Sequence, residues 1–145
     1  MICQDEVRTC SEVIEYEGRQ YAEIIWANTT VAMTTFFSPA ESSFQFGLLA
    51  HNAGFVEPPH YHRPVVRTII DLQQMFLVQR GRVAVQLYTD EGDLLRELVM
   101  NPGDAIVLMQ GVHGIRVIED MQCLSIKQGP FLGTEHDKVN VKVKG

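Results

Sequence analysis

The sequence predicts an all-β fold. Turn residues recur about every eight to twelve positions, and the segments between them are short and rich in β-branched side chains. Several segments alternate, so that Val83, Val85 and Leu87 point to one face of a strand and their neighbours to the other. At 145 residues with 46% hydrophobic side chains, the chain can build one ordinary core and is too short for two. We therefore expect a single all-β domain.

The expected strands lie between residues that tolerate tight or positive-φ turns. These turn residues are found at Arg80-Gly81, Asp90–Gly92, Asn101–Asp104 and Glu119-Asp120. Strands are expected at residues 21–26, 31–37, 44–51, 74–79, 82–88, 94–99, 105–108, 114–118 and 122–127, with a further edge strand at 139–143. The single domain over residues 1–145 then has N-terminal strands within 20–43, a barrel core over about 44–128 and a C-terminal tail over 129–145.

Composition argues against several classes of protein. The formal net charge is −6, and no window gathers Lys or Arg on one face, which disfavours a nucleic-acid partner. No positively charged start leads into an apolar run, and no run approaches the roughly 20 apolar residues that span a bilayer. Cys3, Cys10 and Cys123 lack CxxC spacing, so neither a disulfide framework nor a cysteine zinc site is indicated. We expect a cytoplasmic protein without a membrane partner.

The histidines suggest where the chemistry lies. His60 and His62 are separated by one residue, and on an extended strand that spacing puts both imidazoles on one face. Two imidazoles on a strand, with His113 from a distant strand, could hold one metal ion. Among the all-β architectures, a sandwich, a jelly roll or a closed barrel, three converging histidines favour a barrel.

Two motifs with these histidines resemble the motifs of the cupin family. The first motif holds Gly54, His60, His62, Gln74 and Gly81, and the second holds Gly103, Gly111 and His113. Two features differ from the family pattern: Gln74 stands where most metal-binding cupins carry a glutamate, and His113 follows Gly111 after one residue instead of two. The resemblance covers roughly residues 44–128 and implies a double-stranded β-helix, the cupin jelly-roll barrel. The chain is also similar to small cupins of bacterial surface-polysaccharide gene clusters, which implies no settled reaction.

The resemblance also implies a set of site residues. His60, His62 and His113 would be metal ligands and Gln74 the fourth, around a divalent Fe, Mn, Ni, Cu or Zn ion that the sequence does not choose among. Gln74 could equally hydrogen-bond a ligand histidine or the substrate without coordinating. An amide in place of a carboxylate leaves such a site less negative, which favours an anionic ligand. In the loop between His62 and Gln74, Arg67 and Asp71 are either substrate contacts or solvated charges.

Three function classes remain open from the sequence, and no catalytic residue is assigned. A metalloprotein would bind or convert a small polar, sugar-derived molecule as an isomerase, lyase or dioxygenase. A metal-free sugar-nucleotide isomerase or epimerase would use His60 or His62 as general base, and cupins of that type are similar in having Gln after the paired histidines. A non-catalytic cupin would only bind its small-molecule ligand. A homodimer is expected, because small β-rolls expose sheet edges.

Overall fold

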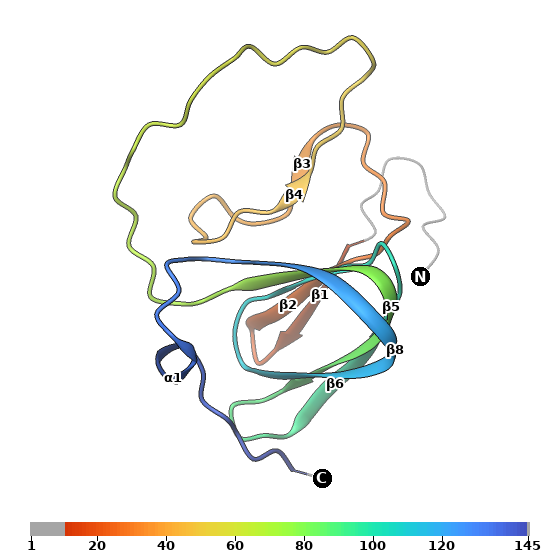
Figure 1. Cartoon of the computed structure of the whole chain (residues 1–145), viewed down its shortest axis with the longest axis vertical. Coiled ribbons are helices and arrows are strands. Elements are labelled where there is room, and N and C mark those ends of the chain that lie inside the picture. Colours follow the sequence, from red (N-terminus) through yellow and green to blue (C-terminus); the bar gives the residue numbers. More distant parts are fainter. Residues whose placement is uncertain (1–10, 145) are drawn as a thin grey trace.

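The computed structural model describes residues 11–144, which are all-β as predicted apart from one helical turn. One antiparallel sheet has the strand order β1-β2-β7-β5-β6, with β8 also pairing with β5. This sheet curls strongly into a half-barrel, and β3 and β4 form a separate small sheet beside it (Figure 1). The strands are β1 (Ser11–Tyr16), β2 (Arg19–Ile25), β3 (Thr35–Phe36), β4 (Gly47–Leu48), β5 (Gln74–Tyr88), β6 (Leu94–Met100), β7 (Ala105–Leu108) and β8 (Val112–Lys127).

The two longest strands form a bent ribbon that gives the half-barrel its curvature. β5 and β8 pair antiparallel from Gln74 opposite Lys127 to Tyr88 opposite Val112. The register shifts between Val78 and Val83, at the point where Gly81 approaches the backbone of Asp120. We call residues 74–78 with 123–127 the first arm, and residues 83–88 with 112–117 the second arm. The bend turns the two arms toward each other.

This ribbon corrects one part of the strand prediction. Arg80-Gly81 and Glu119-Asp120 were expected to end strands, but β5 and β8 continue through both positions. The two pairs of residues lie opposite each other in the ribbon, since Arg82 pairs with Glu119. Residues that permit positive φ serve a bulge as well as a turn, because both need the chain to change direction. Here they bend two paired strands together.

Alternating side chains divide the apolar residues between two core clusters. Ala22 and Ile24 of β2 face the concave side of the half-barrel, where they pack with Ile106 of β7 and with residues of both arms such as Val78 and Val85. The second cluster lies on the opposite face of the sheet, beneath the loops around β3 and β4. It contains Ile25, Phe46, Ala105 and Val107. The sheet is thus covered on its convex face and lined with apolar side chains on its concave face.

Other strand predictions have mixed outcomes. The strands expected at 94–99 and 105–108 are confirmed. The one expected at 21–26 corresponds to β2, which begins two residues earlier and ends one residue earlier. The strand β1 was not predicted, because its sequence carries two glutamates and no clear alternation. The expected strands at 31–37 and 44–51 are reduced to β3 and β4, and 139–143 is not a strand. Alternation favours an extended chain, but a strand also needs a neighbour to accept its backbone hydrogen bonds.

The remaining regular element is a single helical turn, α1 (Thr134–Asp137), in the C-terminal tail. Within residues 11–144 no helix is long and apolar enough to cross a membrane. Residues 49–73 contain no strand and run as a wide arc away from the half-barrel, yellow to green in Figure 1. We call residues 49–73 the histidine segment, since it carries His60 and His62.

Candidate functional site

A cavity of about 610 Å³ lies between the two arms of the ribbon. Its walls come from β5, β7, both ends of β8 and the C-terminal tail, which are distant in sequence and meet because the ribbon is bent. The volume falls within the range of small-molecule sites, roughly 300–1,000 Å³. Its polar lining residues are Gln74, Gln110, His113, Lys127, Asp137, Lys138 and Asn140, and its apolar ones include Leu72, Phe76, Leu108 and Ile115.

Gln74 and His113, two of the residues that the sequence singled out, both line this cavity. Gln74 is the first residue of β5, and its Nε2 donates a hydrogen bond of 2.9 Å to Ser125 Oγ on β8. The bond fixes the amide across the first arm. His113 lies on the second arm opposite Leu87, so its side chain faces the concave side. The structure therefore brings the fourth position of the predicted metal site and its third histidine to one cavity.

The cavity makes His113 easier to deprotonate. The walls remove water from around the imidazole, and this desolvation lowers the pKa of His113 below its ordinary value. The positive charge of Lys138 lowers the pKa further. Both effects disfavour the imidazolium, so His113 is neutral at neutral pH. A neutral imidazole can accept a proton, donate a hydrogen bond from its second nitrogen or bind a metal.

The charges around the cavity are unevenly balanced. Lys127 enters from the end of β8 and Lys138 from the C-terminal tail, while Asp137 is the one acidic residue among those lining the cavity within the described chain. The Lys127 Nζ lies 5.3 Å from the centre of the Phe131 ring, which places the ammonium beside the tail. With His113 neutral, the lining carries a net positive charge although the whole chain has a formal charge of −6. The cavity thus has a small local excess of positive charge.

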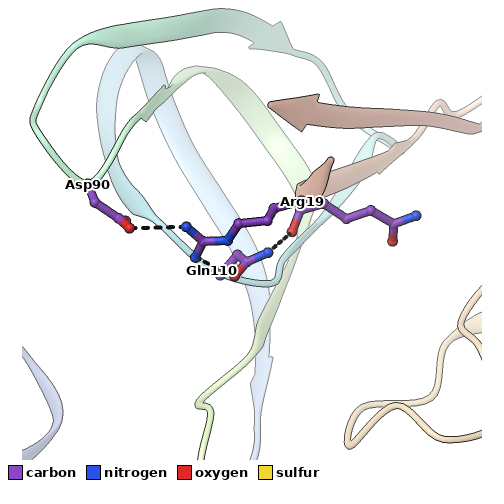
Figure 2. A network of polar contacts seen from close by, with 4 residues as sticks. Arg19, Asp90 and Gln110 are labelled. Carbon is purple, nitrogen blue, oxygen red and sulfur yellow. Dashed lines mark hydrogen bonds and ion pairs between the residues drawn. The ribbon is translucent and has the colours of Figure 1, made fainter. Parts of the chain in front are cut away.

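A polar network fixes the loop that precedes His113 (Figure 2). Arg19, at the start of β2, donates from Nη2 to Gln110 Oε1 at 2.7 Å and from Nη1 to Asp90 Oδ2 at 3.2 Å. Gln110 Nε2 in turn donates to the Gln20 carbonyl oxygen at 2.7 Å. Figure 2 shows the Arg19 side chain reaching between the turn that carries Asp90 and the loop that carries Gln110. The network ties the β1–β2 turn to one rim of the cavity.

Gly111 completes this loop. Its φ is +80°, and an added Cβ would collide with the Tyr21 ring, so the close approach of loop and ring requires glycine. Met109 N and Gln110 N also donate to the Tyr21 carbonyl oxygen, at 2.9 and 3.3 Å. Sequence reasoning gave no role to Arg19, Gln110 or the two cavity lysines. The motifs around His113 contain no signal for partners that lie so far away along the chain.

His60 and His62 lie elsewhere, in the exposed histidine segment. Their ring centres are 5.3 Å apart, so the pair is close together as its spacing predicted, although the segment is not a strand. His60 Nδ1 lies 2.9 Å from the Pro58 carbonyl oxygen, and its Nε2 lies 3.6 Å from Glu57 Oε1. Neither histidine lines the cavity that holds Gln74 and His113. Residues 11–144 gather no group of three or more His, Cys, Asp or Glu side chains able to hold a metal ion.

The two predicted substrate contacts, Arg67 and Asp71, also lie outside the cavity lining. Arg67 Nη1 is 3.5 Å from the Val65 carbonyl oxygen within the exposed segment. Asp71 accepts hydrogen bonds from Ser43 Oγ at 3.0 Å and from Gln73 Nε2 at 2.9 Å, which hold the end of the histidine segment against the loop before β4. In this arrangement their contacts are local and structural.

His51 and Cys123 have packing partners. The His51 ring stacks on Phe55 with the ring centres 3.9 Å apart. Cys123 packs against the concave core cluster, and burial raises the pKa of its thiol, so the thiol stays protonated at neutral pH.

Searches of known protein families, curated proteins and solved structures found no match to this chain.

Proposed function

We propose that this chain binds a small organic anion in the cavity between the two arms. The proposal depends mainly on one observation: Lys127 and Lys138 face a cavity with a single carboxylate, in a protein that is acidic overall. Gln74, Gln110 and His113 add neutral donors and acceptors that suit hydroxyl and carboxylate groups. A charged ligand head would thus meet both cations and directional hydrogen bonds.

We also propose that the half-barrel closes into a double-stranded β-helix of the cupin kind. The support is the histidine segment, which exposes many apolar side chains to solvent, among them Leu49, Val56, Val66 and Ile70. The segment joins the body at Gln74, on the rim of the cavity. Packing it against the open side of the half-barrel would bury this apolar surface, which is favourable in water. Within residues 11–144, β8 pairs with β5 alone and its outer edge is available to a further strand.

The resemblance to cupins implies a divalent transition metal, held by His60, His62, His113 and Gln74. The described positions do not place these four residues around one point, so they do not fit a common ion as they stand. We derive no catalytic step through a metal. When bound, such an ion would act as a Lewis acid toward a carbonyl or carboxylate oxygen.

A metal-free isomerase is a second candidate function, and the position of His113 favours it. A general base must be neutral at the working pH and must reach the ligand; the lowered pKa of His113 and its place in the cavity lining support this role. The sequence suggested His60 or His62 for this role, but neither lines the cavity. In this scheme His113 takes a proton from the hydroxyl-bearing carbon next to a sugar carbonyl while the carbonyl oxygen gains a proton, which gives an enediol. His113 then returns its proton to the former carbonyl carbon as the other hydroxyl loses its proton and becomes the new carbonyl.

The proposed function is tested by calorimetric titration with glucuronate and, as the neutral counterpart, glucose. We expect glucuronate to bind and glucose not to. Lys127→Met should weaken glucuronate binding about tenfold, the value of one charge-assisted hydrogen bond. The matched control is Lys144→Met, because Lys144 is an exposed lysine paired with Asp93 at 3.1 Å, away from the cavity.

Equal affinity for the two sugars, or an equal loss in both lysine variants, would rule out the anion site. The isomerase candidate has a separate readout, namely exchange of sugar C–H protons with deuterated solvent followed by NMR. His113→Gln should abolish exchange and retain binding. Exchange that persists in this variant would exclude His113 as the base.

A further inference from the structure

A second cavity of about 350 Å³ adjoins the first on the concave face of the half-barrel. The two cavities share Phe76 of β5 and Ile115 of β8 as lining residues. None of the residues that line the second cavity in the described chain is charged. They include Val83, Val85 and Met100 of the core, together with Met121, Cys123 and Ser125 of β8.

Along the first arm, the side chains on the concave face of β8 change from apolar to cationic. Cys123, Ser125 and Lys127 share this face because strand side chains alternate with period two, and they pair with Val78, Phe76 and Gln74 of β5. Cys123 lines the second cavity and Lys127 lines the first. Ser125, between them, accepts the hydrogen bond from Gln74 Nε2 at 2.9 Å. The polar cavity and the apolar cavity thus meet at the Gln74–Ser125 bond.

We infer that the ligand is amphipathic, a medium-chain carboxylate whose anionic head lies beside Lys127 and whose alkyl tail lies in the second cavity. This inference rests on the proposed function, which supplies the anion site for the head. A wholly polar ligand would leave the second cavity without a partner, since its walls offer few donors or acceptors. Water finds few hydrogen-bond partners in an apolar cavity of this kind, so such a cavity takes up apolar groups instead.

The protonated Cys123 thiol is consistent with this environment. A thiolate in the cavity wall would repel a carboxylate and hydrate the tail, whereas a neutral thiol behaves as a small apolar group. Ile115 is 46% exposed although it lies on the concave face, so apolar surface there is open to a ligand. An alkyl chain that covers Ile115 and Phe76 removes this surface from water.

The test is a calorimetric titration of the full chain with acetate, butanoate, hexanoate, octanoate and decanoate below their micelle concentrations. Each methylene that enters an apolar cavity contributes about a fourfold gain in affinity. We expect Kd to fall by this factor per methylene until the tail fills the second cavity, and then to level off. Ligand binding should also protect Cys123 from maleimide, read on its own peptide by mass spectrometry, with octanoate protecting and acetate not.

Two variants separate the tail site from the head site. Cys123→Phe fills the second cavity and should abolish the dependence on chain length while leaving acetate affinity unchanged. Its control, Leu124→Phe, adds the same ring one residue away on the opposite face, where Leu124 is 47% exposed, and should change neither quantity. Lys127→Met should weaken every carboxylate by the same factor, about tenfold.

The possible results distinguish the two proposals. If acetate and glucuronate bind but affinity does not rise with chain length, the tail site is wrong and the anion site stands. If affinity rises with chain length and Leu124→Phe removes the rise as Cys123→Phe does, the tail lies elsewhere and the inference fails. If no carboxylate binds at any length, the proposed function and this inference fall together.

Discussion

Replacing Gly81 with alanine should test whether the bend in the β5–β8 ribbon forms the cavity. Gly81 has a φ of +83°, and an added Cβ would overlap the Asp120 carbonyl oxygen and lie 2.7 Å from Met121 Cα. Real Cβ atoms essentially never come within 3.0 Å of such neighbours. Alanine at this position must therefore change its φ or push the two strands apart. Either response opens the angle between the arms.

Two terms set the size of the effect. Positive φ costs an L-residue about 1–2 kcal/mol, and overlap with a packed backbone adds about 1–3 kcal/mol. Gly81→Ala should thus lower the free energy of unfolding by about 2–5 kcal/mol. Gly18→Ala is the matched control, since Gly18 has a φ of +72° and no atom within 4 Å of an added Cβ. Gly18→Ala should lower the free energy of unfolding only by the cost of positive φ, about 1–2 kcal/mol.

Urea unfolding followed by circular dichroism gives both free energies, and titration with glucuronate gives the effect on the site. We expect Gly81→Ala to weaken glucuronate binding severalfold and Gly18→Ala to leave it unchanged. Equal destabilisation by the two substitutions would show that the strands do not approach at Gly81 as described. Unchanged binding in a clearly destabilised Gly81→Ala protein would show that the bend does not shape the site.

Three further changes have defined outcomes. Burial raises the pKa of the Glu23 carboxyl, and a hydrogen bond from Ser11 partly opposes this, so the folded state becomes less stable as pH rises through the raised pKa. In urea unfolding, Glu23→Gln should therefore stabilise the protein by about 1 kcal/mol at pH 7 and not at pH 4, whereas the control Glu15→Gln, at an exposed position, should have no such effect. Arg19→Ala should weaken glucuronate binding with little loss of stability, whereas Arg82→Ala, which breaks a comparable exposed pair with Glu119, should not affect binding. If the histidine segment packs against the half-barrel as proposed, elemental analysis of untagged protein should find about one transition-metal ion per chain, lost in His62→Ala and retained in His51→Ala. Metal-free wild-type protein would contradict the cupin-like site.

The sequence predicted the all-β class and singled out two residues that line the cavity, in both cases for a physical reason. Alternation at Val83, Val85 and Leu87 indicates which face of the strand is buried, and this pattern lies within one segment of the sequence. Gln74 and His113 were found because each lies at a motif position, and both line one cavity. The prediction missed features that depend on how two strands pair. The same glycine-containing pattern serves a turn or a bulge, so the pattern at Arg80-Gly81 could not reveal a continuous β5.

The charged part of the site could not be predicted for a related reason. Lys127 and Lys138 reach the cavity from the end of β8 and from the tail, and Arg19 reaches Gln110 across 91 positions of sequence. Such partners meet only after the sheet has curled, and no local pattern encodes the meeting. His60 and His62 lie close together because they are near neighbours in the chain, but the segment is not the strand that was expected. Their convergence with His113 and Gln74 stays a prediction, as does the homodimer.

The position of β2 in the sheet sets an order of events when the chain folds. β2 is held between β1 and β7, with Ala22 opposite Leu108, so the β1–β2 hairpin, which precedes β7 in the chain, has no inner neighbour until β7 has been made. Contacts this distant are slow to form, because a long loop must close before they contribute any stability. During synthesis one edge of the β1–β2 hairpin therefore stays unpaired until β7 has been made. A chain that stops before β7 should leave that edge open to other unfolded chains.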